Sequence, residues 1–269
     1  MRRVPGTGHP DFTRKAVPKP VKKYVKNTID ANKQNCEKII CEPNDRETGQ
    51  DWTNHAFHGI PQVEIGVGGT TTDLMRLFPQ IQQGDSREQR LGSKLRLKNI
   101  NCRFLFMIPA TVSQNTAHAC VQCRLLVLSS RKYKSFSEVI NNWDSDQTLS
   151  YDWLRSGEQA TRYKGDNHTL NLPVNSAMFV THLDKKFTLN RGRSEDTQNH
   201  VPTPTKIINF NLKCKNKIVR YADDADTEPQ NFAPFAVFMY SYASGTVIVS
   251  TSSDIVTGYC DVKANWKNM

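Results

Sequence analysis

The chain has 269 residues, of which 37% are hydrophobic and 23% charged, and its net charge is +10, from 36 Lys and Arg against 26 Asp and Glu. This is the composition of a polar globular protein, and it excludes collagen-like, wholly disordered and coiled-coil chains. No apolar run approaches the ~18 residues that a membrane helix needs, so we expect no membrane insertion.

The first 28 residues are basic and rich in proline. They hold eight Lys and Arg against Asp11 alone, a net +7. Their prolines interrupt helices, and their few apolar side chains do not offset the entropy of ordering. We therefore expect a flexible basic arm that binds phosphates without reading sequence; a solvated tail that only aids solubility is the alternative. The expected phosphate-binding residues are Arg2, Arg3, Arg14, Lys15, Lys19, Lys22, Lys23 and Lys26.

Aromatic residues in the same arm suggest a second type of contact. Phe12 and Tyr24 can stack on nucleobases, and such stacking tolerates any base sequence. After the arm (1–28), we expect an extension or linker at 29–59 and a core domain at 60–269. The basic cluster also predicts a nuclear import signal, because stretches rich in Lys and Arg are read that way.

Short strands dominate the sequence after residue 60. Val63, Ile65 and Val67 alternate with polar or small residues, a period of two. In the long candidate strand 94–109 the apolar positions change parity after Leu97. This change predicts a β-bulge or bend near residues 98–99.

Later segments repeat the pattern. We expect strands at 121–127, 179–189, 208–214 (half-buried), 235–240 (buried on both faces), 246–251 and 255–262, and one helix after the capping box Ser135-x-x-Glu138. About eight antiparallel strands joined by long loops predict an all-β protein. The specific expectation is a single eight-stranded antiparallel jelly roll, a form of β-sandwich.

Three short motifs resemble metal sites but are incomplete. His55-x-x-His58 lacks further ligands nearby in sequence, and Cys120-x-x-Cys123 on a strand would point to opposite faces. Asp223-Asp224-Ala225-Asp226 suits a hard cation, and a calcium bridge between copies is one interpretation, but a solvated acidic loop is the simpler one. We predict no cofactor, no metal and no catalytic residues. Seven scattered cysteines predict reduced thiols in an intracellular protein.

One segment is more specific than the others. Residues 81–95, IQQGDSREQRLGSKL, combine a Gln-Gly turn, a Gln-Arg-Leu-Gly unit and the start of a Lys-Leu strand. This segment resembles the capsid proteins of circular, Rep-encoding single-stranded DNA viruses, including circovirus-like viruses. The basic strand 96–103, the segment 183–189 and the strand ending at 217–221 extend the resemblance. We expect the side chains of Arg90 and Gln83 to hydrogen-bond to the backbone of this turn and so to stabilise it. The alternative partners of Arg90 are the carboxylates of Asp85 and Glu88.

The resemblance implies a function as well as a fold. It implies a sixty-subunit icosahedral (T=1) shell that packages circular single-stranded DNA in the virion, after passage of the protein through the host nucleus. The implied partners are further copies of the chain, the DNA, a host nuclear import receptor and a host cell-surface receptor. The alternatives are the coat protein of a small RNA virus and a cellular β-sandwich that binds single-stranded nucleic acid or carbohydrate.

Overall fold

A computed structural model describes residues 19–23, 35–40, 55–61, 63–66, 69–108, 120–144, 149–190, 204–248 and 255–269. The chain divides into two units, Met1–Gln34 and Asn35–Met269. The strands are β1 (Asn35–Ile40), β2 (His55–Phe57), β3 (Val63–Gly66), β4 (Gly69–Thr72), β5 (Leu74–Arg76), β6 (Lys94–Met107), β7 (Cys120–Ser130), β8 (Leu154–Ser156), β9 (Gln159–Thr161), β10 (Phe179–Asn190), β11 (Thr205–Arg220), β12 (Pro234–Tyr242) and β13 (Val256–Asn268); the helices are α2 (Phe136–Asp144) and α3 (Asn167–Leu170).

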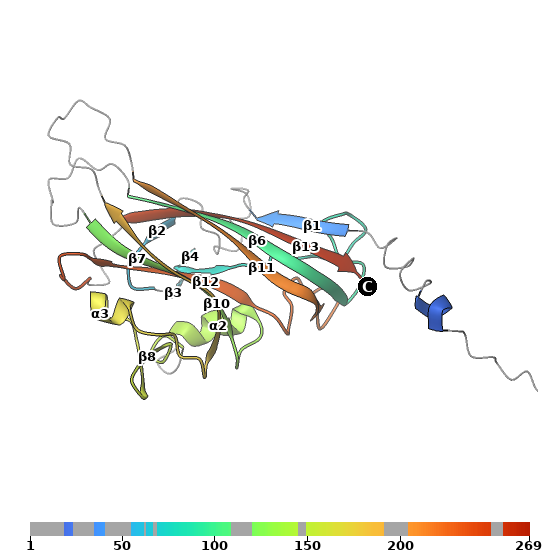
Figure 1. Ribbon diagram of the computed structural model, residues 1–269. Coiled ribbons are helices and arrows are strands. Elements are labelled where there is room, and N and C mark those ends of the chain that lie inside the picture. The colour runs from blue at the N-terminus through green and yellow to red at the C-terminus, as the bar shows by residue number, and fades with distance from the viewer. Residues whose placement is uncertain are drawn as a thin grey trace, which may run out of the picture. The chain divides into compact units, whose positions relative to one another are not determined.

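Two antiparallel sheets make up most of the second unit (Figure 1). The five-stranded sheet has the order β1-β13-β6-β11, with β2 also paired to β13, and the four-stranded sheet has the order β10-β7-β12-β5. The hairpins β3–β4 and β8–β9 stand outside these sheets. The all-β prediction is confirmed, although the described residues form more strands than the eight expected. None of the described helices is long and apolar enough to cross a membrane.

The strand pairs of the two large sheets are nested along the chain. β2 pairs with the last strand, β13, and β5 pairs with β12. Inside these pairs, β6 pairs with β11, and β7 pairs with β10. The first four of these eight strands therefore pair in reverse order with the last four, as the two arms of a long hairpin do. Successive strands within each set of four alternate between the two sheets.

The main core lies between the sheets. It contains Phe104 and Phe106 of β6, Trp266 of β13 and Phe238 of β12, all at most 1% exposed. The Phe106 and Phe238 rings, one from each sheet, stack with 4.3 Å between their centroids. Every residue of β12 is buried, which confirms the expectation for 235–240.

A second apolar cluster covers the other face of the four-stranded sheet. In it, Trp143 of α2 packs edge-on against Trp153 and Phe235. The predicted capping box is confirmed, because the backbone N–H of Glu138 donates to Ser135 Oγ (3.2 Å) and that of Ser135 to Glu138 Oε2 (3.2 Å). These backbone donors lower the pKa of Glu138. The short helix α3 is not foreseen in the sequence.

The segment 29–59, expected to be an extension or linker to the core, includes β1 and β2, which both pair with β13. One expected strand needs correction. The expected strand 246–251 is not a strand at 246–248, and its remaining residues lie outside the described ranges. The final strand instead extends to Asn268, because Val262, Ala264 and Trp266 continue the buried alternation.

Candidate nucleic-acid interface

The five-stranded sheet has one face on the core and one outer face. Along β6, β11 and β13 the alternate side chains that do not enter the core form rows across the three strands. Register pairs Arg103 with Asn209 and Asp261, and the next row joins Asn101 to Asn211 and Lys263. The remaining rows are Thr205–Met107–Thr257, Ile207–Leu105–Tyr259, Lys213–Asn99–Asn265 and Ile218–Arg96–Lys267.

These three strands concentrate the positive charge of the folded unit. They carry eleven basic residues, whereas Asp261 is their one acidic residue. The basic residues are Lys94, Arg96, Lys98, Arg103, Lys206, Lys213, Lys215, Lys217, Arg220, Lys263 and Lys267. Lys206 and Lys217 stand opposite the core residues Phe106 and Leu97 and so lie on the core side, whereas most of the others lie in the outer rows. This excess on the outer face attracts polyanions.

A β-bulge places further cations at the centre of this sheet. Between Leu97 and Asn99 the register with β13 shifts, which leaves Lys98 without an opposite residue and confirms the predicted bulge. The register with β11 shifts at the same level. There Lys215 and Asn216 adopt positive φ, 49° and 60°, an uncommon conformation for residues other than glycine. Such outliers concentrate at functional sites, which makes this bulge part of the candidate interface.

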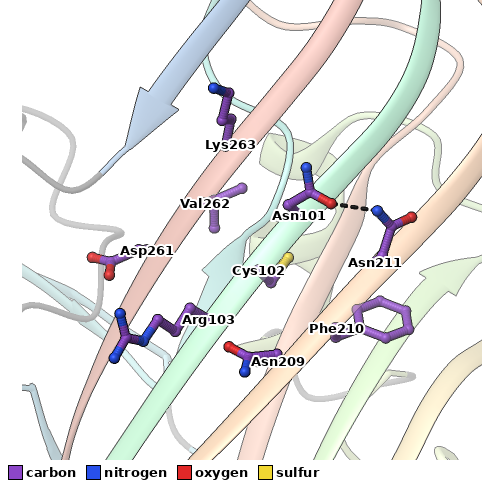
Figure 2. A pocket seen from close by; sticks show the side chains of 9 residues that line it. All are labelled: Asn101, Cys102, Arg103, Asn209, Phe210, Asn211, Asp261, Val262 and Lys263. Atoms are coloured by element: carbon purple, nitrogen blue, oxygen red, sulfur yellow. Dashed lines mark hydrogen bonds between the residues drawn. The ribbon is translucent and has the colours of Figure 1, made fainter.

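A shallow hollow of about 370 Å³ opens on the outer face. Its rim is formed by Asn101, Arg103, Asn209, Asn211, Asp261 and Lys263, and its floor by the backbone around Cys102, Phe210 and Val262 (Figure 2). The Asn211 amide donates a hydrogen bond to Asn101 Oδ1. Arg103 has no ion-pair or hydrogen-bond partner among the described residues, so its guanidinium is available to a ligand.

The predicted arm residues fall mainly outside the described ranges. Lys19, Lys22 and Lys23 lie in an exposed helical segment, 19–23. Pro20 is compatible with this helix because its missing N–H falls in the first turn. Arg2, Arg3, Arg14, Lys15 and Lys26, and the aromatic residues Phe12 and Tyr24, lie outside the described residues.

Arg90, the arginine of the capsid-like segment, is a scaffold residue. Its side chain is fully buried and donates to the carbonyls of Ile81 (3.3 Å) and Gly92 (2.7 Å). It also donates to three carbonyls of the acidic loop, those of Asp223, Asp224 and Asp226, at 2.7–2.9 Å. The expected backbone contacts of Arg90 are therefore confirmed, whereas the Gln83 side chain makes no hydrogen bond among the described residues.

The alternative partners of Arg90 are not found. Arg90 makes neither of the two proposed carboxylate contacts, with Asp85 or Glu88, in the segment that the structure describes. Gly84 provides space in the same turn, since a Cβ there would lie 2.1 Å from Gln89 Oε1. That oxygen accepts from the backbone N–H of Ser86 (3.1 Å) and closes the turn.

The metal-like motifs also have structural partners. The acidic loop at 223–226 does bind a cation, the Arg90 guanidinium, through its backbone carbonyls. His55 Nε2 and His58 Nδ1 contact the buried carboxylate of Asp73 at 2.8 and 3.2 Å. Among the described residues, no group of three His, Cys, Asp or Glu side chains is placed to hold a metal ion.

The described cysteines are thiols inside or at the edge of the core. These are Cys102, Cys120, Cys123, Cys214 and Cys260; the side chains of Cys36 and Cys41 lie outside the description. Burial raises the pKa of Cys102 to about 12 and that of Cys214 to about 11. Cys120 and Cys123 both lie on β7, as expected for residues on a regular strand.

Sequence reasoning identified the basic strand 96–103 but not the basic face that β6 forms with β11 and β13. The chain outside the arm has little net charge, because acidic residues elsewhere cancel the basic strands when charges are simply summed. The available signal was local: Lys94, Arg96 and Lys98 alternate with leucines at the period of a half-buried strand. No protein-family model matches the chain. No curated protein matches its sequence either.

Proposed function

We propose that this chain is a viral capsid protein that assembles into a closed icosahedral shell around single-stranded DNA. The observation that carries the proposal is a nested-pair β-sandwich with one basic outer face. Nested pairing of β2 with β13, β5 with β12, β6 with β11 and β7 with β10 is what results when one long hairpin is wound into two sheets. This supports an eight-stranded jelly roll, an architecture used by viral capsids and also by lectins and cupins.

Charge distinguishes between these uses of the jelly roll. Lectin and cupin sites bind neutral sugars or metals, whereas an outer face that holds most of the eleven basic residues of β6, β11 and β13, and only one acidic residue, suits a polyanion. The chain runs from the basic arm into β1, a strand of that same sheet. We infer that the arm and the outer face of the five-stranded sheet both contact the enclosed nucleic acid. The resemblance of residues 81–95 to capsid proteins of circular single-stranded DNA viruses supports the same function.

A carbohydrate-binding or small cellular module is the main competitor from another class. It predicts a monomer or dimer with no enclosed nucleic acid. The oligomeric state and the presence of enclosed nucleic acid therefore distinguish the two functions.

The test is electron microscopy of the purified full chain, followed by extraction of nuclease-protected nucleic acid. We expect closed particles of uniform diameter that protect nucleic acid from added nuclease. Protected DNA supports the proposal in full, and protected RNA would replace it with an RNA-virus coat protein. A protein that elutes as a monomer or dimer at every salt concentration and protects nothing would refute the capsid function.

A further inference from the structure

The hollow on the outer face of the five-stranded sheet differs chemically from the basic surface around it. Its rim has three neutral amides, Asn101, Asn209 and Asn211, beside Arg103. Asn211 donates to Asn101 Oδ1. The NH₂ group of Asn101 and the side-chain carbonyl of Asn211 therefore have no partner among the described residues. Paired donors and acceptors of this kind match the edges of nucleobases, as in the pairing of Asn with adenine and of Arg with guanine.

Asp261 also makes the hollow chemically unlike a phosphate-binding site. It is the one acidic residue on the three long strands, and it stands opposite Arg103 in the register of β6 and β13. A carboxylate repels a phosphate at this position, but it accepts hydrogen bonds from the exocyclic amino group of a base. The hollow therefore favours a base over the backbone of a nucleic acid.

The next row of the sheet offers an apolar and aromatic surface. Ile207 is 48% exposed, and Leu105 and Tyr259 are partly exposed beside it. Register places Tyr259 opposite Leu105, one row from Arg103. Aromatic side chains next to cations are the usual stacking positions for bases in proteins that bind single strands.

We propose that the hollow and Tyr259 together bind an unpaired nucleobase of single-stranded nucleic acid, while the surrounding lysines and arginines bind its phosphates. This inference rests on the proposed function, since it takes the enclosed polyanion to be nucleic acid. It adds that the folded unit recognises bases as well as charge. Duplex bases are already stacked and paired, so they cannot occupy this site.

The test compares a short labelled DNA strand with an abasic strand of the same length, which keeps the phosphates and lacks the bases. Binding of both to the full-length protein is measured by fluorescence anisotropy over a range of salt concentrations. We expect the native protein to bind the base-containing strand more tightly. Asn101→Ala, Asn209→Ala and Tyr259→Ala should each weaken that binding by at least about fivefold.

The same variants should leave the abasic strand and the salt dependence unchanged, because they remove no phosphate contact. The matched control is Lys213→Gln on the same face, which should weaken both strands equally and lower the salt slope by about 0.7. Unchanged thermal unfolding of each variant excludes loss of folding, and Asn209→Ser provides a milder substitution with the same expected direction. Asp261→Asn should increase the binding of the abasic strand.

Equal affinity of the native protein for the two strands would overturn the base site, and so would equal losses for both strands in the three variants. Particle formation by the same preparations is followed separately by electron microscopy. Particles without base preference overturn only this inference. Base preference in a protein that never assembles would support the base site and refute the capsid function.

Discussion

The guanidinium of Arg90 lies over the ring of Tyr221, with 4.2 Å between Arg90 Cζ and the ring centroid. Tyr221 directly follows β11, so this contact joins the turn before β6 to the end of its neighbouring strand. The ring covers one face of a cation whose three nitrogens each donate to backbone carbonyls. A buried charge is thus compensated by dipoles and a π-system, without a carboxylate.

Removal of the Arg90 side chain should destabilise the folded unit severely. Arg90→Ala leaves the carbonyls of Ile81, Gly92 and the 223–226 loop without their donors in a buried site. We expect the free energy of unfolding to fall by at least about 3 kcal/mol, as measured by denaturant unfolding.

Two further variants make this prediction specific. Arg90→Lys keeps the charge but cannot reach five carbonyls from one ammonium group, so it should recover only part of the loss. Glu88→Ala, an exposed position in the same turn, should change stability by less than about 0.5 kcal/mol. Stability equal to that of the native protein in Arg90→Ala would show that the capsid-like segment does not depend on this arginine.

Deletion of the basic arm should separate packaging from folding. Residues 1–28 add little apolar surface, so their loss should change the unfolding free energy of the core by less than ~1 kcal/mol. Affinity for single-stranded nucleic acid should fall, and the slope of log affinity against log salt should decrease by up to about 0.7 for each lost phosphate contact. Reversal of charge at Lys22, Lys23 and Lys26 should produce a fraction of that decrease. An arm-deleted protein that packages as much nucleic acid as the intact chain would disprove the role of the arm.

The basic sheet face should contribute a second, smaller part of the same salt slope. Arg96→Gln and Lys213→Gln remove cations that have no partner among the described residues. Each should reduce the slope by about 0.7 if it contacts a phosphate, in the intact and the arm-deleted protein alike. Lys185→Gln, an exposed cation on β10 of the other sheet, is the matched control and should leave the slope unchanged. An equal effect of Lys185→Gln would mean that general charge, and not this face, determines binding.

Stability should fall in alkaline solution through the buried thiols. Burial raises the pKa of Cys102 from its ordinary 9.0 to about 12. Between pH 9 and 12 the unfolded chain therefore releases a proton that the folded chain retains, and this favours unfolding as the pH rises. Below pH 9 both states keep the proton, so the thiol adds no pH dependence there. Cys102→Ala should flatten the decline in denaturant midpoint between pH 9 and 11, whereas an unchanged decline would assign it to other groups.

Alternating apolar residues determined most of the strands. The parity change in β6 was sufficient to predict the bulge at Lys98, because a period-two strand with one buried face cannot change parity without an extra residue. The continuous apolar run of β12 likewise predicted a strand buried on both faces. The capping box predicted the start of α2, since its hydrogen bonds join residues only three apart.

Long-range pairing could not be read from the sequence. The segment before residue 60 has short strands whose partner lies some two hundred residues later in β13, and no local pattern specifies that partner. The five carbonyls around Arg90 come from two segments far apart in the chain, so its neighbours in sequence, Asp85 and Glu88, were equally reasonable partners before the fold was known.

The sequence by itself determined that this protein is all-β, with a basic arm and one scaffold turn, because those properties depend on composition and local periodicity. Only the tertiary structure decided that β6, β11 and β13 lie side by side and place most of their basic residues on one face. A sum over the chain hides that face, since the acidic residues other than Asp261 lie outside these three strands. Electrostatic attraction depends on distance, and distances between strands are set by the sheet order.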